Sequence, residues 1–342
     1  MSLCVPLLLA LTPGTADEDP AVAAARKREQ LVRTARFEVR VREVHARGAR
    51  SDRAGAAVRT PVPAAEMVVE WDGALVISGN KARVETNQPM WTGTRFGPPR
   101  QRVDVSDGDL RTTFFPDGLG PDRVPQGLVE RSAGAGAADS TLWAPASMVC
   151  RGFGPDLLVR AETDEAAEVI EGDRCREYTA PGPARYWLAV DKGYVVRRIR
   201  HGGAFQTTWQ TDVQYRQDDS FGWLPSDWAL TEYGRDGRTL VTTTVTVAGV
   251  RLNEAVPDET FRVTFPPGTR VGDSVARKDY SVGPDGTWHE VDPAALIRFA
   301  GHPEPPGLGV WWQLALFAWL GVAVVLGVLL AIWLKLRRTS IG

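Results

Sequence analysis

Few side chains of this sequence stand at the spacings that catalysis or metal binding requires. Ser78 and Lys81 are separated by two residues, which is the serine–lysine spacing of a known nucleophilic motif. That motif needs the serine at the start of a helix and the lysine one turn later. Here the intervening Gly79-Asn80 lies between apolar, strand-like runs. The sequence therefore predicts a turn at this position and not a nucleophile.

Carboxylates cluster at 104–109, where Asp104, Asp107 and Asp109 fall within six residues. A calcium loop needs a longer, fixed ligand spacing that ends in a bidentate glutamate, so Asp107-Gly108 is better explained as a hairpin turn. No motif of a nucleophile elbow, phosphate loop or dinucleotide site is present. The histidines have no partners at metal-ligand spacing; they are His45, His201, His289 and His302. We predict no catalytic residue, metal or cofactor, and therefore a protein that is not an enzyme.

The elements that would position any site are mostly strands. One helix is predicted at 19–35, where Asp19 can cap the first turn, Pro20 fits it and good helix formers follow. The next stretch, 36–42, alternates apolar and charged residues and predicts a half-buried strand. The apolar stretch 67–78 is interrupted by Asp72-Gly73 and predicts a hairpin there, as the Asp107-Gly108 step does in 102–115.

Further strand-like stretches rich in tryptophan, valine and threonine follow between 185 and 247. Two stretches break the pattern: 119–141 is rich in glycine and alanine and predicts a flexible loop, and 301–309 is a proline-rich stalk. A helix followed by consecutive antiparallel strands predicts a mainly β (α+β) fold. We expect one large, curved antiparallel sheet that forms an incomplete barrel with covering helices.

The stretch 310–334 contains 25 residues and no charge. At about 1.5 Å per residue it reaches roughly 37 Å, enough to cross a bilayer core of about 30 Å. Aromatic rings flank it and basic residues follow it, so we predict a C-terminal transmembrane helix with the tail 335–342 in the cytoplasm. The expected membrane-interface residues are Trp311, Trp312, Trp333, Lys335, Arg337 and Arg338.

The N-terminus agrees with export. Residues 1–16 contain a short apolar run followed by Gly14 and Ala16, small residues at the −3 and −1 positions of a signal-peptide cleavage site. We predict an exported domain at 17–300 and a single-pass protein of the bacterial inner membrane with this domain on the periplasmic side. Three basic residues of the tail leave the rest of the chain with a net charge of −5 and no basic stripe, which argues against nucleic acid.

Two cysteines, Cys150 and Cys175, remain in the exported domain. Cysteines outside the cytoplasm usually pair, so we predict a disulfide bond between them.

Many large rings lie on the predicted strands. Core packing explains most buried rings, but a curved sheet leaves a concave side that its own side chains need not fill. We therefore expect an apolar cavity above about 300 Å³ on that side, lined by some of these rings. The candidates are Trp71, Trp91, Phe114, Trp187, Trp209, Trp223 and Trp228.

Three stretches in order resemble the closing strands of bacterial outer-membrane lipoprotein-sorting (LolA-like) domains. They are 185–200 with a Trp-bearing strand and an Asp-Lys-Gly turn, 211–233 with Trp-Leu-Pro-x-x-Trp, and 252–271 with Asn253, Phe261 and Pro266-x-Gly268. The helix-then-strand start at 19–41 fits as well. The resemblance implies an incomplete barrel with helices as a lid, and lipid or acylated protein in its cavity. In 253–271 we expect scaffold, with Phe261, Val263 and Phe265 pointing inward from a strand.

Two functions follow from these expectations. The first is a membrane-anchored binding module that holds a lipid, an acyl chain or a lipoprotein in an apolar half-barrel cavity. The alternative is an envelope sensor or interaction protein that acts through a membrane-protein partner, without transport of a ligand. The anchor excludes free shuttling between membranes, which the soluble carriers of the family perform.

The predicted topology has a direct test. Protease added to intact spheroplasts should remove almost the whole chain, because the large domain is expected outside the inner membrane. Protection of the large domain, measured by immunoblotting against it, would reverse the orientation.

Overall fold

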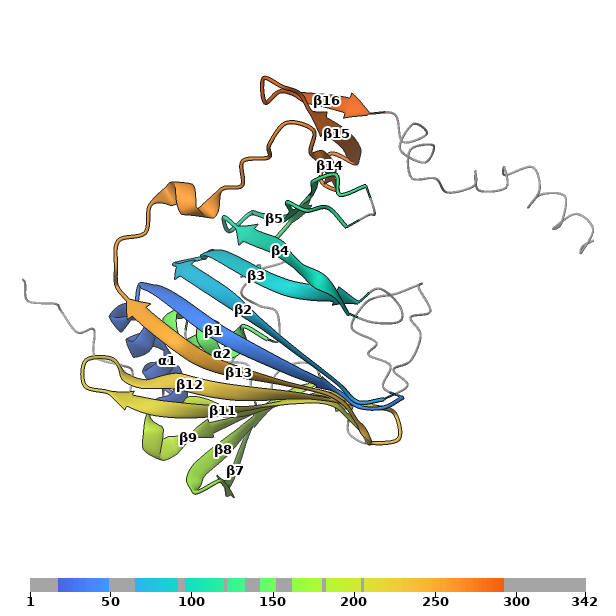
Figure 1. The fold of residues 1–342 in the computed structure, drawn as a ribbon. Coiled ribbons are helices and arrows are strands. Elements are labelled where there is room, and N and C mark those ends of the chain that lie inside the picture. The colour runs from blue at the N-terminus through green and yellow to red at the C-terminus, as the bar shows by residue number, and fades with distance from the viewer. Residues whose placement is uncertain are drawn as a thin grey trace, which may run out of the picture. The chain divides into compact units, whose positions relative to one another are not determined.

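The computed structural model describes residues 18–48, 65–91, 96–119, 122–132, 142–151, 162–179, 183–203 and 206–291. The chain divides into two compact units, Met1–Trp288 and His289–Gly342. In its described ranges, the first unit contains two α-helices and most of a large sheet, shown in Figure 1.

The helices are short and the strands are long. The α-helices are α1 (Pro20–Leu31) and α2 (Ala144–Arg151), and the 3-10 helices are η2 (Val190–Lys192) and η3 (Asp258–Phe261). The first strands are β1 (Thr34–His45), β2 (Met67–Ser78), β3 (Lys81–Trp91), β4 (Phe96–Ser106), β5 (Leu110–Phe115), β6 (Gln126–Arg131), β7 (Glu162–Ile170) and β8 (Asp173–Thr179). The later strands are β9 (Ala184–Ala189), β10 (Val195–Gly203), β11 (Gln206–Asp218), β12 (Gly222–Tyr233), β13 (Thr239–Leu252), β14 (Arg270–Asp273), β15 (Lys278–Val282) and β16 (Trp288–Val291).

From β15 onward the sheet has the order β15-β14-β6-β5-β4-β3-β2-β1-β13-β12-β11-β10-β9-β8-β7. The pairing of β1 with β13 brings the first strand against one that follows about 200 residues later, and the pairs on either side are antiparallel. The pair β6–β14 is parallel, because β14 returns to the sheet after a long crossing segment. The prediction of a mainly β fold built on one large antiparallel sheet is confirmed.

Both helices lie on one face of the sheet, which we call the helix face (Figure 1). The helix α2 contacts β1, β2, β12 and α1. In turn, α1 packs against side chains of β8, β9 and β10. Seven inter-strand steps separate β2 from β8, which would be about 34 Å in a flat sheet. Two neighbouring helices cover only about 20 Å, so the sheet curves around them and the helix face is concave.

The helix α1 begins where the sequence predicts. Asp19 is the N-cap, its Oδ1 accepts from the amide of Ala21 at 2.7 Å, and Pro20 occupies the first turn. The helix ends at Leu31, earlier than the predicted 35, because β1 already begins at Thr34. Its buried residues are Ala21, Val22 and Ala25.

The central core lies between α2 and the middle strands. On β1 the side chains of Phe37, Val39 and Val41 point to the helix face and are buried, while the charged residues between them point away. Val245 of β13 and Trp228 of β12 continue this surface. The alternation of apolar and charged residues at 36–42 therefore predicts the buried face of β1 correctly.

The opposite face, which we call the outer face, is covered in a different way. The segment 253–269 crosses the outer face after β13, and Phe261 and Phe265 pack there against Phe114 and Val103. The rings of Phe114 and Phe265 meet edge to face, with centroids 5.3 Å apart. Phe261 and Phe265 are buried, as predicted for scaffold residues. The strand expected at 261–265 is wrong, because Asp258–Phe261 forms a 3-10 helix and the residues after it are irregular.

Two predicted turns have different outcomes. Asp107-Gly108 connects β4 to β5, with Asp107 Oδ1 accepting from the amides of Asp109 and Leu110 at 3.0 and 2.8 Å. By contrast, the hairpin predicted at Asp72-Gly73 is wrong, because β2 runs unbroken through it and turns only after Ser78. The turn after Ser78 is the one predicted from Gly79-Asn80, where Gly79 has a φ of +55°.

Gly73 has a packing role in β2. A Cβ at this position would lie 2.9 Å from Cη2 of Trp143, the residue before α2, so only glycine admits the ring. The flexible loop predicted at 119–141 is also wrong in part, because β6 lies within it and pairs with β5 and β14. Residues 133–141 of that stretch lie outside the described residues.

The contact between Gly73 and Trp143 predicts the effect of a single methyl group. Gly73→Ala should lower the free energy of unfolding by about 1–3 kcal/mol, because the strand or the ring must shift. Gly249→Ala is the matched control: its nearest atom would be Glu38 Oε2 at 3.5 Å, an ordinary contact. Denaturant unfolding of the full chain in mild detergent compares the two. Equal stability of both variants would contradict the proposed packing of Trp143.

Candidate functional site

The helix face beneath α2 is a continuous apolar surface. Trp143 is buried, with 3% of its surface exposed, and belongs to the same cluster as Trp71 and Trp228. Both of these indoles satisfy their N–H groups at the margin of the cluster. Trp228 Nε1 donates to the carbonyl oxygen of Leu142 at 2.8 Å, and Trp71 Nε1 donates to Glu43 Oε1 at 3.1 Å. The surface is therefore mainly apolar, and the two indole N–H groups are satisfied at its margin.

The helix α1 is held to the sheet at both ends by hydrogen bonds. Tyr178 of β8 donates from its hydroxyl to the capping residue Asp19 at 3.2 Å. Burial raises the pKa of Tyr178, and the charge of Asp19 raises it further, so the phenol remains a donor at neutral pH. Near the other end, Arg28 donates to the carbonyl oxygen of Gly193 at 3.3 Å.

Asn253 fixes the connection between α1 and β1. Its Nδ2 donates to the carbonyl oxygen of Leu31 at 2.8 Å, and its Oδ1 accepts from the amide of Arg33 at 2.8 Å. Asn253 has a φ of +55°, a left-handed conformation that asparagine tolerates better than most residues. The chain between the last turn of α1 and the first residue of β1 is therefore a fixed, two-residue joint.

A small cavity of about 10 Å³ lies under both helices. It is lined by Ala21, Ala25 and Arg28 of α1, by Pro145, Met148 and Val149 of α2, and by Tyr194, Val196, Tyr215 and Trp223. The volume is close to that of one water-sized probe, so the helices are closed onto the sheet in this structure.

The predicted ring residues divide between the two faces. Trp71 and Trp228 are core residues of the helix face, Trp209 packs beside α1 and stacks on His201 at 5.0 Å, and Trp223 lines the small cavity. Phe114 and Trp187 are on the outer face, in separate clusters, so neither contributes to a concave lining. Trp91 ends β3, and its side chain lies outside the described residues.

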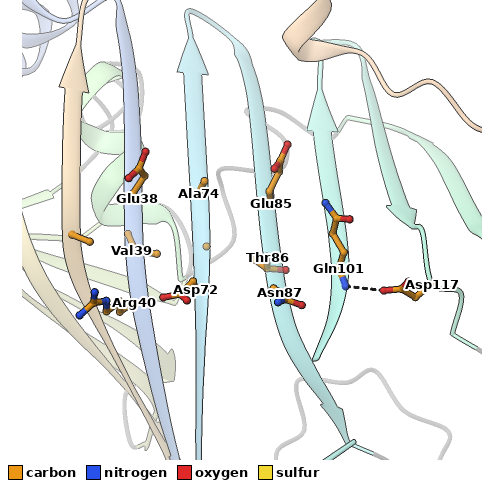
Figure 2. A pocket seen from close by; sticks show the side chains of 12 residues that line it. Glu38, Val39, Arg40, Asp72, Ala74, Glu85, Thr86, Asn87, Gln101 and Asp117 are labelled. Carbon is orange, nitrogen blue, oxygen red and sulfur yellow. Dashed lines mark hydrogen bonds between the residues drawn. The ribbon is translucent and has the colours of Figure 1, made fainter. Parts of the chain in front are cut away.

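A wide groove lies on the outer face, and most of the residues that line it are charged or polar. Figure 2 shows its floor across β1 to β4, with Ala74 between the carboxylates of Glu38 and Glu85. Its volume is about 700 Å³, and a second cavity of about 240 Å³ shares Ala74 and Glu85 with it. This groove touches none of the candidate rings, and the cavity under the helices measures only about 10 Å³. The prediction of an apolar cavity above about 300 Å³ on the concave side is therefore wrong for the described residues. Glu38 and Glu85 already pair with Arg251 and Arg83, as a solvated charged face would.

The helix face becomes polar toward β4 and β5. Asp104, which is 5% exposed, accepts from Arg102 and Arg111 and from Thr113 Oγ1 at 2.6 Å. Burial alone would raise the pKa of Asp104, but the hydrogen bond and charge of Arg102 outweigh it, with Thr113 and Arg111 adding to the effect, and lower the pKa. This carboxylate, which the sequence placed in a simple turn cluster, therefore stays ionised as the centre of a buried network.

The two cysteines lie on opposite faces. Cys150 of α2 belongs to the central cluster on the helix face. Cys175 and Tyr178 are three residues apart on β8 and so point to opposite faces, and Tyr178 is the one that contacts α1. The structure contains no bond between Cys150 and Cys175, so the predicted disulfide is not formed.

Sequence analysis missed three residues that build this site: Trp143, Tyr178 and Asn253. The helix α2 has only eight residues and follows a glycine- and alanine-rich stretch, so its periodicity is too short to recognise. Tyr178 gives no signal, because its partner Asp19 is far away in sequence. Asn253 appears in the motif that suggested the family, although its role as a joint is visible only in three dimensions.

The predicted signal peptide and transmembrane segment lie outside the described residues, as do Trp311, Trp312, Trp333, Lys335, Arg337 and Arg338. Within the part of the chain that the structure describes, no helix is long and apolar enough to span a membrane. The same part contains no group of three or more His, Cys, Asp or Glu side chains placed to hold a metal ion.

No family model and no curated protein matches this chain. Solved structures that match include a DUF1329 family protein from Desulfovibrio piger, with 13% identity, a TM-score of 0.44, and coverage of 72% of this chain and 98% of that one. A LolA superfamily protein from Nitrosomonas europaea has 12% identity, a TM-score of 0.41 and coverage of 72% and 99%. An outer membrane lipoprotein-sorting protein domain, described as putative, from Vibrio parahaemolyticus has 11% identity, a TM-score of 0.42 and coverage of 70% and 95%. The family that the sequence resembles is therefore among its structural neighbours, and these similarities concern the course of the chain alone.

The state of Cys175 is open to a chemical test. Burial, and then the charge of Asp173, raise the pKa of this thiol to about 11, and its surface is fully buried. A thiol reagent at pH 8 should therefore leave Cys175 unlabelled in the folded chain and label it after unfolding without reductant. Peptide mass spectrometry reads the result. Labelling that appears only after a reductant is added would restore the disulfide.

Proposed function

We propose that this domain binds an apolar chain, that of a lipid or of an acylated protein, between the helices α1 and α2 and the helix face of the sheet. We further propose that 310–334 anchors it in the bacterial inner membrane, with the domain on the periplasmic side. The domain then acts as a stationary binding module close to its lipid supply, and it is not an enzyme.

The main support for this proposal is the way in which α1 and α2 cover the helix face. The sheet presents apolar side chains from β2 to β8, and the cover consists of one helix of 12 residues and one of 8. The buried residues of α1 are small: Ala21, Val22 and Ala25. A cover made of small side chains leaves space for a ligand as soon as it moves outward, whereas a cover of large side chains would have to be replaced.

The attachment of α1 suits such a movement. Its hydrogen bonds include those between Tyr178 and Asp19 and between Arg28 and Gly193, while Asn253 holds the joint between α1 and β1. Two hydrogen bonds are worth about 1–3 kcal/mol together. Burial of about 300 Å² of alkyl chain offers roughly 7 kcal/mol before association costs, so ligand binding can outweigh their loss.

The outer groove favours a second candidate function, that of an interaction protein. A polar groove of about 700 Å³, lined by Glu38, Asp72 and Asp117 among others, suits a polar segment of a membrane-protein partner better than it suits a lipid. In this alternative the domain senses or recruits a partner and carries no ligand.

Photochemical labelling in membranes distinguishes the two. The full chain is reconstituted in phosphatidylcholine vesicles that contain a trace of palmitic acid with a terminal diazirine. After irradiation, the labelled peptides are identified by mass spectrometry. We expect label on peptides of α1, α2 and the start of β12, where Trp223 lies, because these line the closed cavity.

A matched pair of variants on α1 controls this experiment. Ala25→Trp fills the space under the helix and should reduce the label at least about fivefold, because overpacking costs about 1–3 kcal/mol. Ala23→Trp, on the exposed side of the same helix, should leave the label unchanged. Label confined to 310–334 in the wild-type chain would contradict lipid binding and leave the interaction protein as the proposal.

A further inference from the structure

The small cavity under both helices has a positive charge in its wall. Of the described residues that line it, only Arg28, in the last turn of α1, has a charged side chain. The other lining residues are apolar or aromatic. The hydroxyl of Tyr215 donates to the carbonyl oxygen of Val196 at 2.8 Å, and burial raises the pKa of Tyr215, so this phenol stays neutral. Arg28 is thus a cation in an otherwise uncharged wall.

The charge of Arg28 is weakly compensated by the described residues. Its hydrogen bond goes to the carbonyl oxygen of Gly193, with a nitrogen–oxygen distance of 3.3 Å. No carboxylate of the described residues forms an ion pair with it, whereas Arg26 on the same helix pairs with Glu18. Burial lowers the pKa of Arg28, because its surroundings disfavour the charged form. A guanidinium has five N–H groups, so Arg28 retains donors for an anionic acceptor.

The backbone that meets Arg28 has an unusual conformation. Gly193 and Tyr194, between η2 and β10, have φ values of +66° and +58°. Such a left-handed φ costs glycine little, but it is uncommon for a residue with a large side chain. The turn is fixed by the amide of Tyr194, which donates to the carbonyl oxygen of Ala189 at 2.9 Å. Tyr194 lines the cavity, and strained residues of this kind are concentrated at ligand sites.

The wall around Arg28 continues into the apolar surface under α2. Val149 of α2 lines the small cavity and also belongs to the central cluster with Trp228. Tyr215 likewise lines the cavity and packs against the same cluster. An amphiphile with its head at Arg28 can therefore extend its chain under α2 along the helix face once α1 moves outward.

We infer that Arg28 binds the carboxylate of a single-chain amphiphile, a free fatty acid, whose chain lies under α1 and α2. The inference rests on the proposed function and specifies its ligand class. A guanidinium binds a carboxylate through two parallel hydrogen bonds, and the carboxylate takes the place of the Gly193 carbonyl as the acceptor of Arg28. A diacyl phospholipid fits this wall less well, because its glycerol esters would meet apolar and aromatic side chains.

The test compares two photoreactive probes with the same chain, palmitic acid and hexadecanol, each with a terminal diazirine. Each is present at trace level in phosphatidylcholine vesicles with the full chain, and its label on the helix-face peptides is divided by its amount in the vesicles. We expect at least about fivefold more label from the acid than from the alcohol, because the acid alone offers a charged acceptor to Arg28.

Three variants of α1 separate binding from structure. Arg28→Gln removes the charge and should reduce the ratio of acid to alcohol toward one. Arg28→Lys keeps the charge but loses the planar fork, so it should keep a preference of at least about twofold. Arg26→Gln is the matched control: it removes an arginine of the same helix whose side chain is 53% exposed, and it should leave the ratio unchanged.

The ratio also excludes a merely structural role of Arg28. A basic residue in the last turn of a helix is favoured by the helix dipole, and its bond to Gly193 helps to hold α1. If that were its whole role, Arg28→Gln would change the label of both probes alike and leave the ratio intact. That result, or equal label from acid and alcohol in the wild-type chain, would overturn the carboxylate site while lipid binding still holds.

Two further outcomes concern the ligand itself. Absence of label from either probe on the helix face would overturn the proposed function. Unlabelled palmitic acid should displace the labelled acid, and unlabelled phosphatidylglycerol should not. Displacement by phosphatidylglycerol alone would make the head a phosphate and would overturn a free fatty acid as the ligand.

Discussion

One constraint shapes the whole first unit: its sheet has an apolar face from β2 to β8, and two short helices must keep that face from water. A flat sheet would be too wide for such a cover. Curvature brings β2 and β8 within reach of the same helix pair, and it brings Tyr178 of β8 close enough to bond Asp19 at the start of α1. The same apolar face must be covered at Gly73, where the ring of Trp143 packs directly over the backbone and occupies the space of a side chain.

The two faces of the sheet are covered by different kinds of side chain, and this difference suggests where binding occurs. On the outer face, large rings such as Phe261 and Phe265 interlock with the sheet, and the crossing segment also pairs as β14 with β6. On the helix face, α1 contributes small side chains and a few hydrogen bonds. The outer cover is therefore integral to the sheet, whereas α1 can separate from it at the cost of few interactions.

Local signals in the sequence predict the strands and the start of α1 well. The alternation at 36–42 identifies the buried face of β1, and Asp19-Pro20 identifies the helix N-terminus. Asp72-Gly73 misleads, because the same dipeptide serves a turn at 107–108 and a close packing contact at 72–73, and only the position of Trp143 distinguishes them.

The site is less predictable because its parts come from distant strands. Periodicity assigns Trp71 and Trp228 to the interior, but it does not distinguish a packed core from a lining. Periodicity also cannot decide whether Trp187 and Trp209 lie on the same face, because that depends on the register between their strands. The bonds of Asp104 to Arg102, Arg111 and Thr113 become visible only through the pairing of β4 with β5.

The central claim is that α1 opens while the sheet stays folded. Hydrogen–deuterium exchange of the full chain in phosphatidylcholine vesicles measures this directly. The account predicts that amides of α1 exchange much faster than those of the central strands β1 and β13, and that added anionic lipid slows α1 selectively. Exchange of α1 at the same rate as β1 and β13, unchanged by lipid, would show that the cover opens only when the whole domain unfolds, and would contradict the account.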